Sequence, residues 1–206
     1  MKKHWYDYLW IAEIVYFSLG LFNILFAWLG LISMALPLGF AVFGGNKAYC
    51  NRYCGRGQLF SLLGGRLGLS RRAVPPDFLR SRAFRLGFLA FFGVMFGLML
   101  RGTWQVFSGA RDLKAAVTLL WTFRVPWGWA WHGGAPLWAA QFAFGLYSIM
   151  LTSTVLGLFT MAMFRPRSWC VYCPMGTLTQ LICRAKAHDA GSEPQKTFYR
   201  TGGNHS

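Results

Sequence analysis

The fold is decided by residues 136–178, which read PLWAAQFAFGLYSIMLTSTVLGLFTMAMFRPRSWCVYCPMGTL. From Pro136 to Phe164 no residue is charged, and as a helix this run is long enough to cross about 30 Å of hydrocarbon. Basic residues follow at once, and then the paired cysteines Cys170 and Cys173. The stretch therefore predicts a transmembrane helix that ends in a cysteine motif.

A second cysteine motif, AYCNRYCGRGQL at residues 48–59, lies about 120 residues earlier and also follows an apolar tract. Both motifs have an aromatic residue before the first cysteine, a Tyr before the second and Gly-x-Leu at the same offset behind it. The first pair is Cys50-x3-Cys54, and the second is Cys170-x2-Cys173 followed by Pro174. The shared pattern indicates that the chain repeats one unit, a membrane segment followed by a cysteine pair.

The composition agrees with a membrane protein. Of the 206 residues, 55% are hydrophobic and only 13% are charged, which is too apolar for an ordinary soluble domain. The net charge is +15, but the basic residues cluster beside apolar spans, so the positive-inside rule explains them and we expect no nucleic-acid partner.

Two more apolar tracts complete the predicted membrane domain. Residues 83–106 form one clear span, and residues 8–45 would be about 57 Å long as a single helix, too long for one crossing. We therefore expect the first tract to form a hairpin that turns near residues 27–30, with Pro37 kinking its second arm. The alternative is one span followed by a re-entrant piece.

The predicted fold class is an all-α integral membrane protein of about four transmembrane helices, arranged as a duplicated unit of two helices plus a cysteine motif. Residues 1–190 form a single membrane domain with repeat halves at about 5–65 and 83–186. Residues 191–206 are polar and lack periodicity, and we expect a disordered tail.

Between the later spans, residues 112–123 are expected to form a short amphipathic helix, followed by an aromatic belt at Trp127, Trp129 and Trp131. Small residues that recur along the two spans predict close helix–helix packing. They are Gly87, Gly93, Gly97, Gly145, Ser148, Thr152 and Ser153.

Arginines and lysines surround both cysteine motifs, so the positive-inside rule predicts that both motifs face the cytoplasm, in a multi-pass protein of the inner (cytoplasmic) membrane. The flanking basic residues are Lys47, Arg52, Arg56, Arg66, Arg71, Arg72, Arg80, Arg82, Arg85, Arg165, Arg167, Arg184 and Lys186. Lys2 and Lys3 favour a cytoplasmic N-terminus.

The cysteine pairs carry the predicted chemistry. Four thiolates supplied as two pairs, Cys50 with Cys54 and Cys170 with Cys173, match the ligand count of a four-cysteine metal or iron–sulfur site. A helix-like run follows each motif, so the second cysteine of each pair should lie at a helix N-terminus, where free N–H groups favour an anion. Cys183 stands alone and is expected to be an ordinary apolar residue on a helix face.

These motifs resemble those of the NapH/NosR-type polyferredoxin-like membrane proteins, which carry cytoplasmic Cys-x3-Cys-Pro motifs after transmembrane helices, with Gly-x-Leu behind them. The resemblance covers residues of roughly 30–65 and 136–185. It implies membrane electron transfer between quinol or cytoplasmic donors and a partner redox subunit. The second motif has one residue fewer between its cysteines, the first lacks the proline, and the sequence holds none of the ferredoxin runs that the family's longer members append, so we expect a short form.

The sequence thus predicts a membrane electron-transfer subunit in which Cys50, Cys54, Cys170 and Cys173 bind one [4Fe–4S] cluster at the cytoplasmic face. The alternatives are a thiol–disulfide membrane protein and a non-redox protein with a structural zinc ion. Whether the chain is itself an enzyme stays open, and an electron-transfer subunit is favoured.

Other residues suggest partners. Glu13 is a carboxylate inside the first apolar tract, which makes it a candidate for a quinone or proton role, although a place near the interface explains it equally well. A basic surface made by Arg52, Arg56, Arg66, Arg71, Arg72 and Arg167 would attract an acidic ferredoxin or flavoprotein, or else anionic lipid. A membrane reductase subunit is a further candidate partner.

Overall fold

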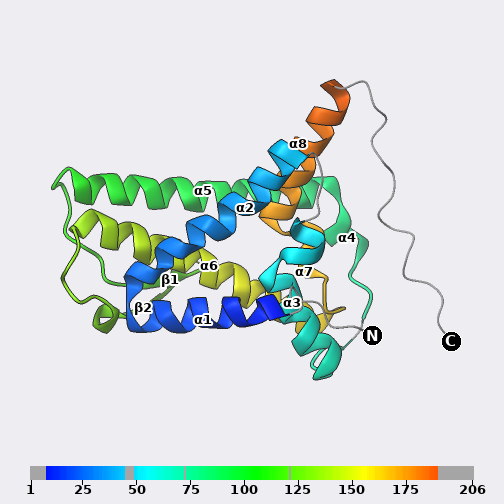
Figure 1. The fold of residues 1–206 in the computed structure, drawn as a ribbon, viewed down its shortest axis with the longest axis horizontal. Coiled ribbons are helices and arrows are strands. Elements are labelled where there is room, and N and C mark those ends of the chain that lie inside the picture. Colours follow the sequence, from blue (N-terminus) through cyan, green and yellow to red (C-terminus); the bar gives the residue numbers. More distant parts are fainter. Residues whose placement is uncertain (1–7, 45–48, 72, 121, 190–206) are drawn as a thin grey trace.

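The computed structural model describes residues 8–44, 49–71, 73–120 and 122–189. Within these ranges the chain is mostly helical with one short β-hairpin (Figure 1), so the expectation of a helical fold is confirmed, while about four spans in a duplicated unit stay a prediction. In chain order the elements are α1 (Leu9–Phe22), the 3-10 helix η2 (Ile24–Trp28), α2 (Leu29–Gly44), the π-helix η3 (Tyr49–Tyr53), α3 (Gly55–Ser61), the π-helix η4 (Leu62–Arg66), α4 (Asp77–Arg80), α5 (Arg82–Phe107), β1 (Val117–Leu119), β2 (Phe123–Val125), the 3-10 helix η5 (Gly128–Ala130), α6 (Leu137–Met163), α7 (Trp169–Tyr172) and α8 (Pro174–Asp189).

Three helical segments are long and apolar enough to cross a membrane. They are Ile24–Gly44, Arg82–Phe107 and Leu137–Met163, with 21, 26 and 27 residues. The last two match the spans predicted at residues 83–106 and 136–164. At a rise of about 1.5 Å per residue, α5 and α6 are each about 40 Å long, which exceeds the hydrocarbon thickness.

The first apolar tract breaks at Asn23. This residue is extended, with φ −141° and ψ 118°, and its side-chain oxygen accepts a hydrogen bond from the Leu25 N–H at 3.0 Å. The predicted turn at residues 27–30 was therefore placed a few residues too late, because the capping amide at Asn23 ends α1 first. Figure 1 shows α1 and α2 running in opposite directions from this break. With 14 residues, α1 is only about 21 Å long. Pro37 lies inside α2, which continues past it.

The expected amphipathic helix at residues 112–123 was wrong. The chain forms the antiparallel hairpin β1–β2 instead, with Val117 opposite Val125, Thr118 opposite Arg124 and Leu119 opposite Phe123. The backbone of β1 bonds to α6: the Thr118 N–H donates to Ser148 Oγ at 2.9 Å, and the Leu120 N–H donates to Thr152 Oγ1 at 3.4 Å. A helix would have kept these N–H groups for itself, so tertiary hydrogen bonds decide the local structure here.

The packing of α6 differs in part from the expected small-residue pattern. At Gly145 an added Cβ would lie 2.3 Å from Met99 Cγ of α5, so that glycine is a close helix contact as predicted. Gly87, Gly93 and Gly97 of α5 have no such neighbour within 4 Å, so these three face no packed helix. Ser148 and Thr152 bind the β-hairpin rather than another helix.

The centre of the molecule is α6, which packs against α5, η2 and β1. Phe60 of α3 is fully buried, and its ring lies over Gly157, where an added Cβ would be 2.3 Å from Phe60 Cζ. This contact fixes the segment after the first cysteine motif against α6. Figure 1 shows η3, α3, α7 and α8 gathered at one end of the long helices and the β-hairpin towards the other. Residues 191–206 and the N-terminal lysines lie outside the described residues.

Candidate metal centre

Each cysteine pair ends directly before a helix, as predicted. Cys54 is the N-cap of α3, and its carbonyl accepts the Gln58 N–H at 3.1 Å. Cys173 precedes α8, which begins at Pro174, and its carbonyl accepts the Thr177 N–H at 2.9 Å. The two motifs therefore share one local geometry, in which free N–H groups of a first helical turn lie beside a thiol.

Gly57 is the point where the two motifs meet. A Cβ added to it would lie 3.9 Å from Cys54 Sγ and 3.8 Å from Cys170 Sγ. The two sulfurs, far apart in the chain, thus both lie within 4 Å of the position that a Cβ would take on this glycine. The Gly57 N–H also donates a hydrogen bond to the Cys54 sulfur. In the second motif Gly176 holds the equivalent place, three residues after Cys173.

The other two cysteines belong to the same group. Cys50 Sγ lies 3.9 Å from Thr179 Oγ1 of α8, so a cysteine of the first motif touches the helix that follows the second. The charges that Cys54, Cys173 and Cys50 would carry as thiolates all act on Cys170. Cys183 lies farther along α8 and is not among the charged groups that act on Cys54 or Cys170. None of the five cysteines forms a disulfide.

The thiols are not assembled around a single point. Among the described residues, no three Cys, His, Asp or Glu side chains converge closely enough to hold one metal ion. A cluster binds each thiolate at a different iron atom, so its ligands stand further apart than those of one ion. The donor set fits such a group: four thiols from two motifs, a glycine that leaves space between two of them, and a backbone N–H directed at a sulfur.

Two of these cysteines, Cys54 and Cys170, have raised thiol pKa values. Burial raises the pKa of the Cys54 thiol to about 11, against a lowering by the Gly57 N–H. Burial also raises the pKa of the Cys170 thiol, and Cys54 and Cys173 add to that effect, while Arg167 opposes it. Neighbouring thiolates repel one another, so a positively charged group bound between them would be required to hold all four ionised.

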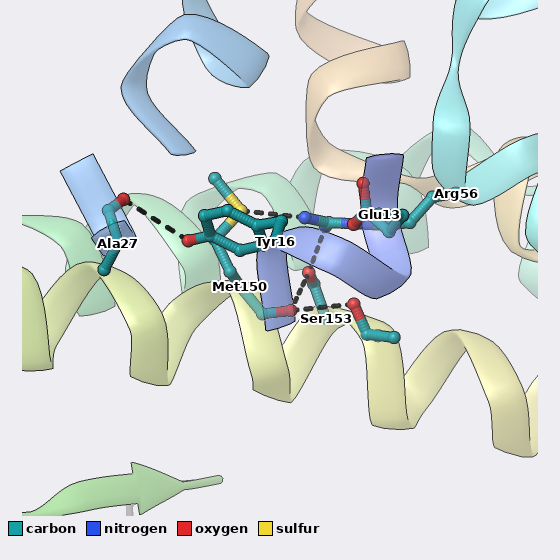
Figure 2. A network of polar contacts seen from close by, with 7 residues as sticks. Glu13, Tyr16, Ala27, Arg56, Met150 and Ser153 are labelled. Atoms are coloured by element: carbon teal, nitrogen blue, oxygen red, sulfur yellow. Dashed lines mark hydrogen bonds and ion pairs between the residues drawn. The ribbon is translucent and has the colours of Figure 1, made fainter. Parts of the chain in front are cut away.

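Beside the thiols lies a buried polar network centred on Arg56 (Figure 2). Arg56 Nε donates to Glu13 Oε1 of α1 at 2.5 Å, Nη1 donates to Ser153 Oγ, and Nη2 contacts Met150 Sδ at 2.8 Å. One guanidinium therefore joins the first motif to α1 and α6. Its charge also lowers the pKa of Cys54.

The network corrects two expectations. Glu13 is not an isolated acid in the membrane, because it is paired with Arg56. Arg56 does not belong to the basic surface, because only 15% of its side chain is exposed. The Arg52 and Arg72 side chains lie outside the described residues, whereas Arg66, Arg71 and Arg167 are exposed.

A cavity of about 230 Å³ lies between α1, α2 and the first motif. Its polar lining comes from Glu13, Arg56 and three tyrosines, and its apolar lining includes residues from both helices. Among the lining residues are Leu9, Ala12, Tyr16, Ile32, Ser33, Leu36, Tyr49, Tyr53 and Gly55. Tyr49, Tyr53, Gly55 and Arg56 belong to the first motif or flank it, so the cavity borders that segment of the chain.

Sequence reasoning missed Gly57, Thr179 and the role of Arg56. A signal for the glycine was present, since Gly57 and Gly176 both follow the second cysteine of their motif by three residues. No local pattern marked Thr179 or the pairing of Arg56 with Glu13. Comparison with known proteins gave no match: no family model, no curated protein and no solved structure is significantly similar to this chain.

Proposed function

We propose that this protein is a membrane electron-transfer subunit in which Cys50, Cys54, Cys170 and Cys173 bind one [4Fe–4S] cluster. The observation that carries the proposal is that Cys54 Sγ of the first motif and Cys170 Sγ of the second both lie close to Gly57, 3.9 and 3.8 Å from an added Cβ. A bound cluster would accept one electron from a donor and pass it to an acceptor, with no bond to substrate made or broken. The protein would hold the thiolates and compensate their charge with Arg56, Arg167 and backbone N–H groups.

The meeting of the two motifs at Gly57 supports a group shared between them over disulfide exchange within each pair. Thiol–disulfide chemistry would need only the two cysteines of one motif. A structural zinc ion would need four sulfurs at about 2.3 Å from one point. Among the described residues no three such side chains meet at one point, so metal analysis of the purified protein must distinguish the two groups.

The membrane arrangement belongs to the same proposal. We take α1 and α2 as one helical pair and α5 and α6 as a second, each followed by a cysteine motif, so that four segments form a duplicated unit. Most basic residues lie near the cysteine motifs, at one end of the long helices. Their position favours a cytoplasmic location for that end, in a protein of the inner membrane. This arrangement would also account for the resemblance to the NapH/NosR-type proteins.

The deciding experiment is anaerobic purification followed by iron, sulfide and zinc analysis, visible absorption and electron paramagnetic resonance. We expect iron and sulfide in equal amounts, a visible band lost on reduction and no stoichiometric zinc. Replacing Cys50, Cys54, Cys170 or Cys173 singly by Ser should each reduce or abolish the cluster, and Cys183→Ser should leave it intact. Zinc without sulfide would support the structural ion, and cysteines that cycle through disulfides without metal would support the thiol–disulfide alternative.

The cavity beside the first motif supports quinone as the electron donor or acceptor. Its volume suits a ring-sized headgroup rather than a whole drug-sized ligand. Ile32 and Leu36 at its edge are 55% and 43% exposed, which would let an isoprenoid tail leave between α1 and α2 into lipid. The tyrosine hydroxyls and the Glu13–Arg56 pair offer polar partners for a carbonyl.

The assignment of this cavity as a quinone site is tested by filling it with a larger side chain. We expect Ser33→Phe to slow reduction of the cluster by decylubiquinol without changing the iron content. Val42→Phe adds the same ring to an exposed position of α2 that does not line the cavity, so it should leave the rate unchanged. Equal rates for Ser33→Phe and the unmodified protein would rule out this cavity as the quinone site.

The exposed arginines near the motifs support an acidic redox partner such as a ferredoxin or flavoprotein. Replacing Arg71 and Arg167 together by Gln should slow cluster reduction by a reduced ferredoxin at low salt and matter little at high salt, because exposed charges are screened. An unchanged rate and salt dependence would mean that these residues serve topology and lipid contacts.

A further inference from the structure

The β-hairpin lies alongside the middle of α6 rather than beyond its end. Its backbone bonds to Ser148 and Thr152, which stand near the middle of the 27-residue α6. From the first residue of α6 they are about 16 and 22 Å along the axis of a helix about 40 Å long. The tip of the hairpin therefore reaches the central part of the span.

Side chains of α6 accept hydrogen bonds from backbone N–H groups along one edge of the hairpin, the β1 edge. Lys114 N–H donates to Gln141 Oε1 at 2.9 Å, and further along the hairpin Thr118 N–H and Leu120 N–H donate to the hydroxyls of Ser148 and Thr152. Four helical residues advance by about 6 Å and two strand residues by about 6.7 Å, so the hydroxyls match alternate N–H groups of the strand. The side chains of α6 thus accept the backbone hydrogen bonds that a neighbouring strand would otherwise accept.

The other edge, β2, is open. Because the Thr118 N–H points towards α6, Thr118 and Arg124 form a non-hydrogen-bonded pair of the antiparallel ladder. The backbone N–H and C=O of Arg124 therefore point away from β1. Within the described part of the chain, no residue bonds to them.

The same position carries an unpaired charge. The Arg124 side chain is exposed, and the ion pair found among the described residues is Arg56 with Glu13. The neighbouring Phe123 is 64% exposed. An open strand edge and an unpaired guanidinium are both unfavourable against lipid, because hydrocarbon offers neither hydrogen bonds nor a counter-charge.

We propose that the β2 edge binds a transmembrane helix of a different membrane protein, one that places a carboxylate opposite Arg124 and hydroxyl groups four residues apart along the strand edge. Charge complementarity requires the carboxylate, and α6 shows in this chain how such a helix satisfies a strand. Among the carboxylates whose side chains the structure describes, none is free on a membrane-spanning helix of a second copy: Glu13 is held by Arg56, Asp77 begins the short α4, and Asp112 precedes the hairpin. The proposal depends on the membrane placement of α6 and is independent of the cluster.

The test uses synthetic single-span peptides in phosphatidylcholine vesicles with the purified full chain. The first peptide is a leucine-rich helix with a central Glu and a Ser four residues to either side, and the matched peptide has Gln in place of the Glu. Energy transfer from protein tryptophan to a dansyl group on the peptide reports binding. We expect the Glu peptide to bind about tenfold more tightly than the Gln peptide, in line with polar contacts between membrane helices.

Arg124→Gln should abolish this preference, while Arg101→Gln, which removes an exposed arginine of α5, should keep it. Thermal unfolding of both variants establishes that they are folded. Equal binding of the two peptides, or a preference that survives Arg124→Gln, would overturn the proposal. So would self-association of the chain alone that is lost in Arg124→Gln, because the occupant would then be a second copy.

Discussion

Arg56 Nε donates to Glu13 Oε1 at 2.5 Å, with only 15% and 11% of the two side chains exposed. The pair joins α1 to the residues directly behind Cys54, across 43 positions of sequence. A charge at the equivalent place is missing from the second motif, where Met175 stands two residues after Cys173. The two halves of the site are therefore alike in their cysteines and different in their electrostatic support.

Replacing one member of this pair should lower the stability of the fold far more than replacing both. We expect Glu13→Gln to lower the free energy of unfolding by about 3–5 kcal/mol, because it leaves a buried guanidinium unpaired. The double variant Glu13→Gln/Arg56→Met, which copies the second motif at position 56, should recover much of that loss. Thermal unfolding of the unmodified protein, the two single variants and the double variant in detergent gives the double-mutant cycle. Additive effects of the two substitutions would show that the pair is not coupled.

Gly57 should be required for the cluster and not for the fold. A methyl group at this position would lie 3.7–3.9 Å from Cys54 and Cys170 atoms, which is ordinary contact, so Gly57→Ala should fold normally. It would nevertheless fill the space between two ligand sulfurs, and we expect the iron content to fall severalfold. Gly65→Ala is the control, because its methyl group would meet nothing within 4 Å. Full iron content in Gly57→Ala would contradict a group bound between Cys54 and Cys170.

Orientation can be measured with a membrane-impermeant thiol reagent on intact cells. Asp77 and Ser108 are exposed and lie at opposite ends of α5. Because the basic residues gather at the Asp77 end, we expect Ser108→Cys to be labelled from outside and Asp77→Cys only after the cells are opened. The reverse pattern would place the cysteine motifs outside.

The hydroxyls of α6 should hold the hairpin alongside the middle of that helix. Thr152→Val keeps the shape of the side chain but leaves the Leu120 N–H without its acceptor, a loss of about 1–3 kcal/mol. We expect faster hydrogen exchange at Leu120 and Thr118. Thr154→Val is the matched control, since Thr154 Oγ1 bonds to the Met150 carbonyl of its own helix. Unchanged exchange in Thr152→Val would mean that other contacts hold β1.

The sequence by itself determined the spans and the places of the thiols. Uncharged runs such as residues 136–164 must form helices in hydrocarbon, because only intrasegment hydrogen bonds satisfy their backbone. The cysteine before each new helix followed equally from local pattern, since Pro174 and Gly55 begin helices at known positions. Length and composition sufficed in these cases because the forces involved act within one segment.

Only the tertiary structure decided the conformation of residues 112–123 and the partner of Glu13. Residues 112–123 had a helical pattern, yet Ser148 and Thr152 accept the backbone N–H groups of Thr118 and Leu120 and hold that segment as a strand. The burial of Glu13 likewise depends on its ion pair with Arg56, and the local hydropathy of the sequence does not reveal that pairing. Both outcomes depend on polar groups brought together from distant segments, where the cost of an unpaired buried group outweighs local preference.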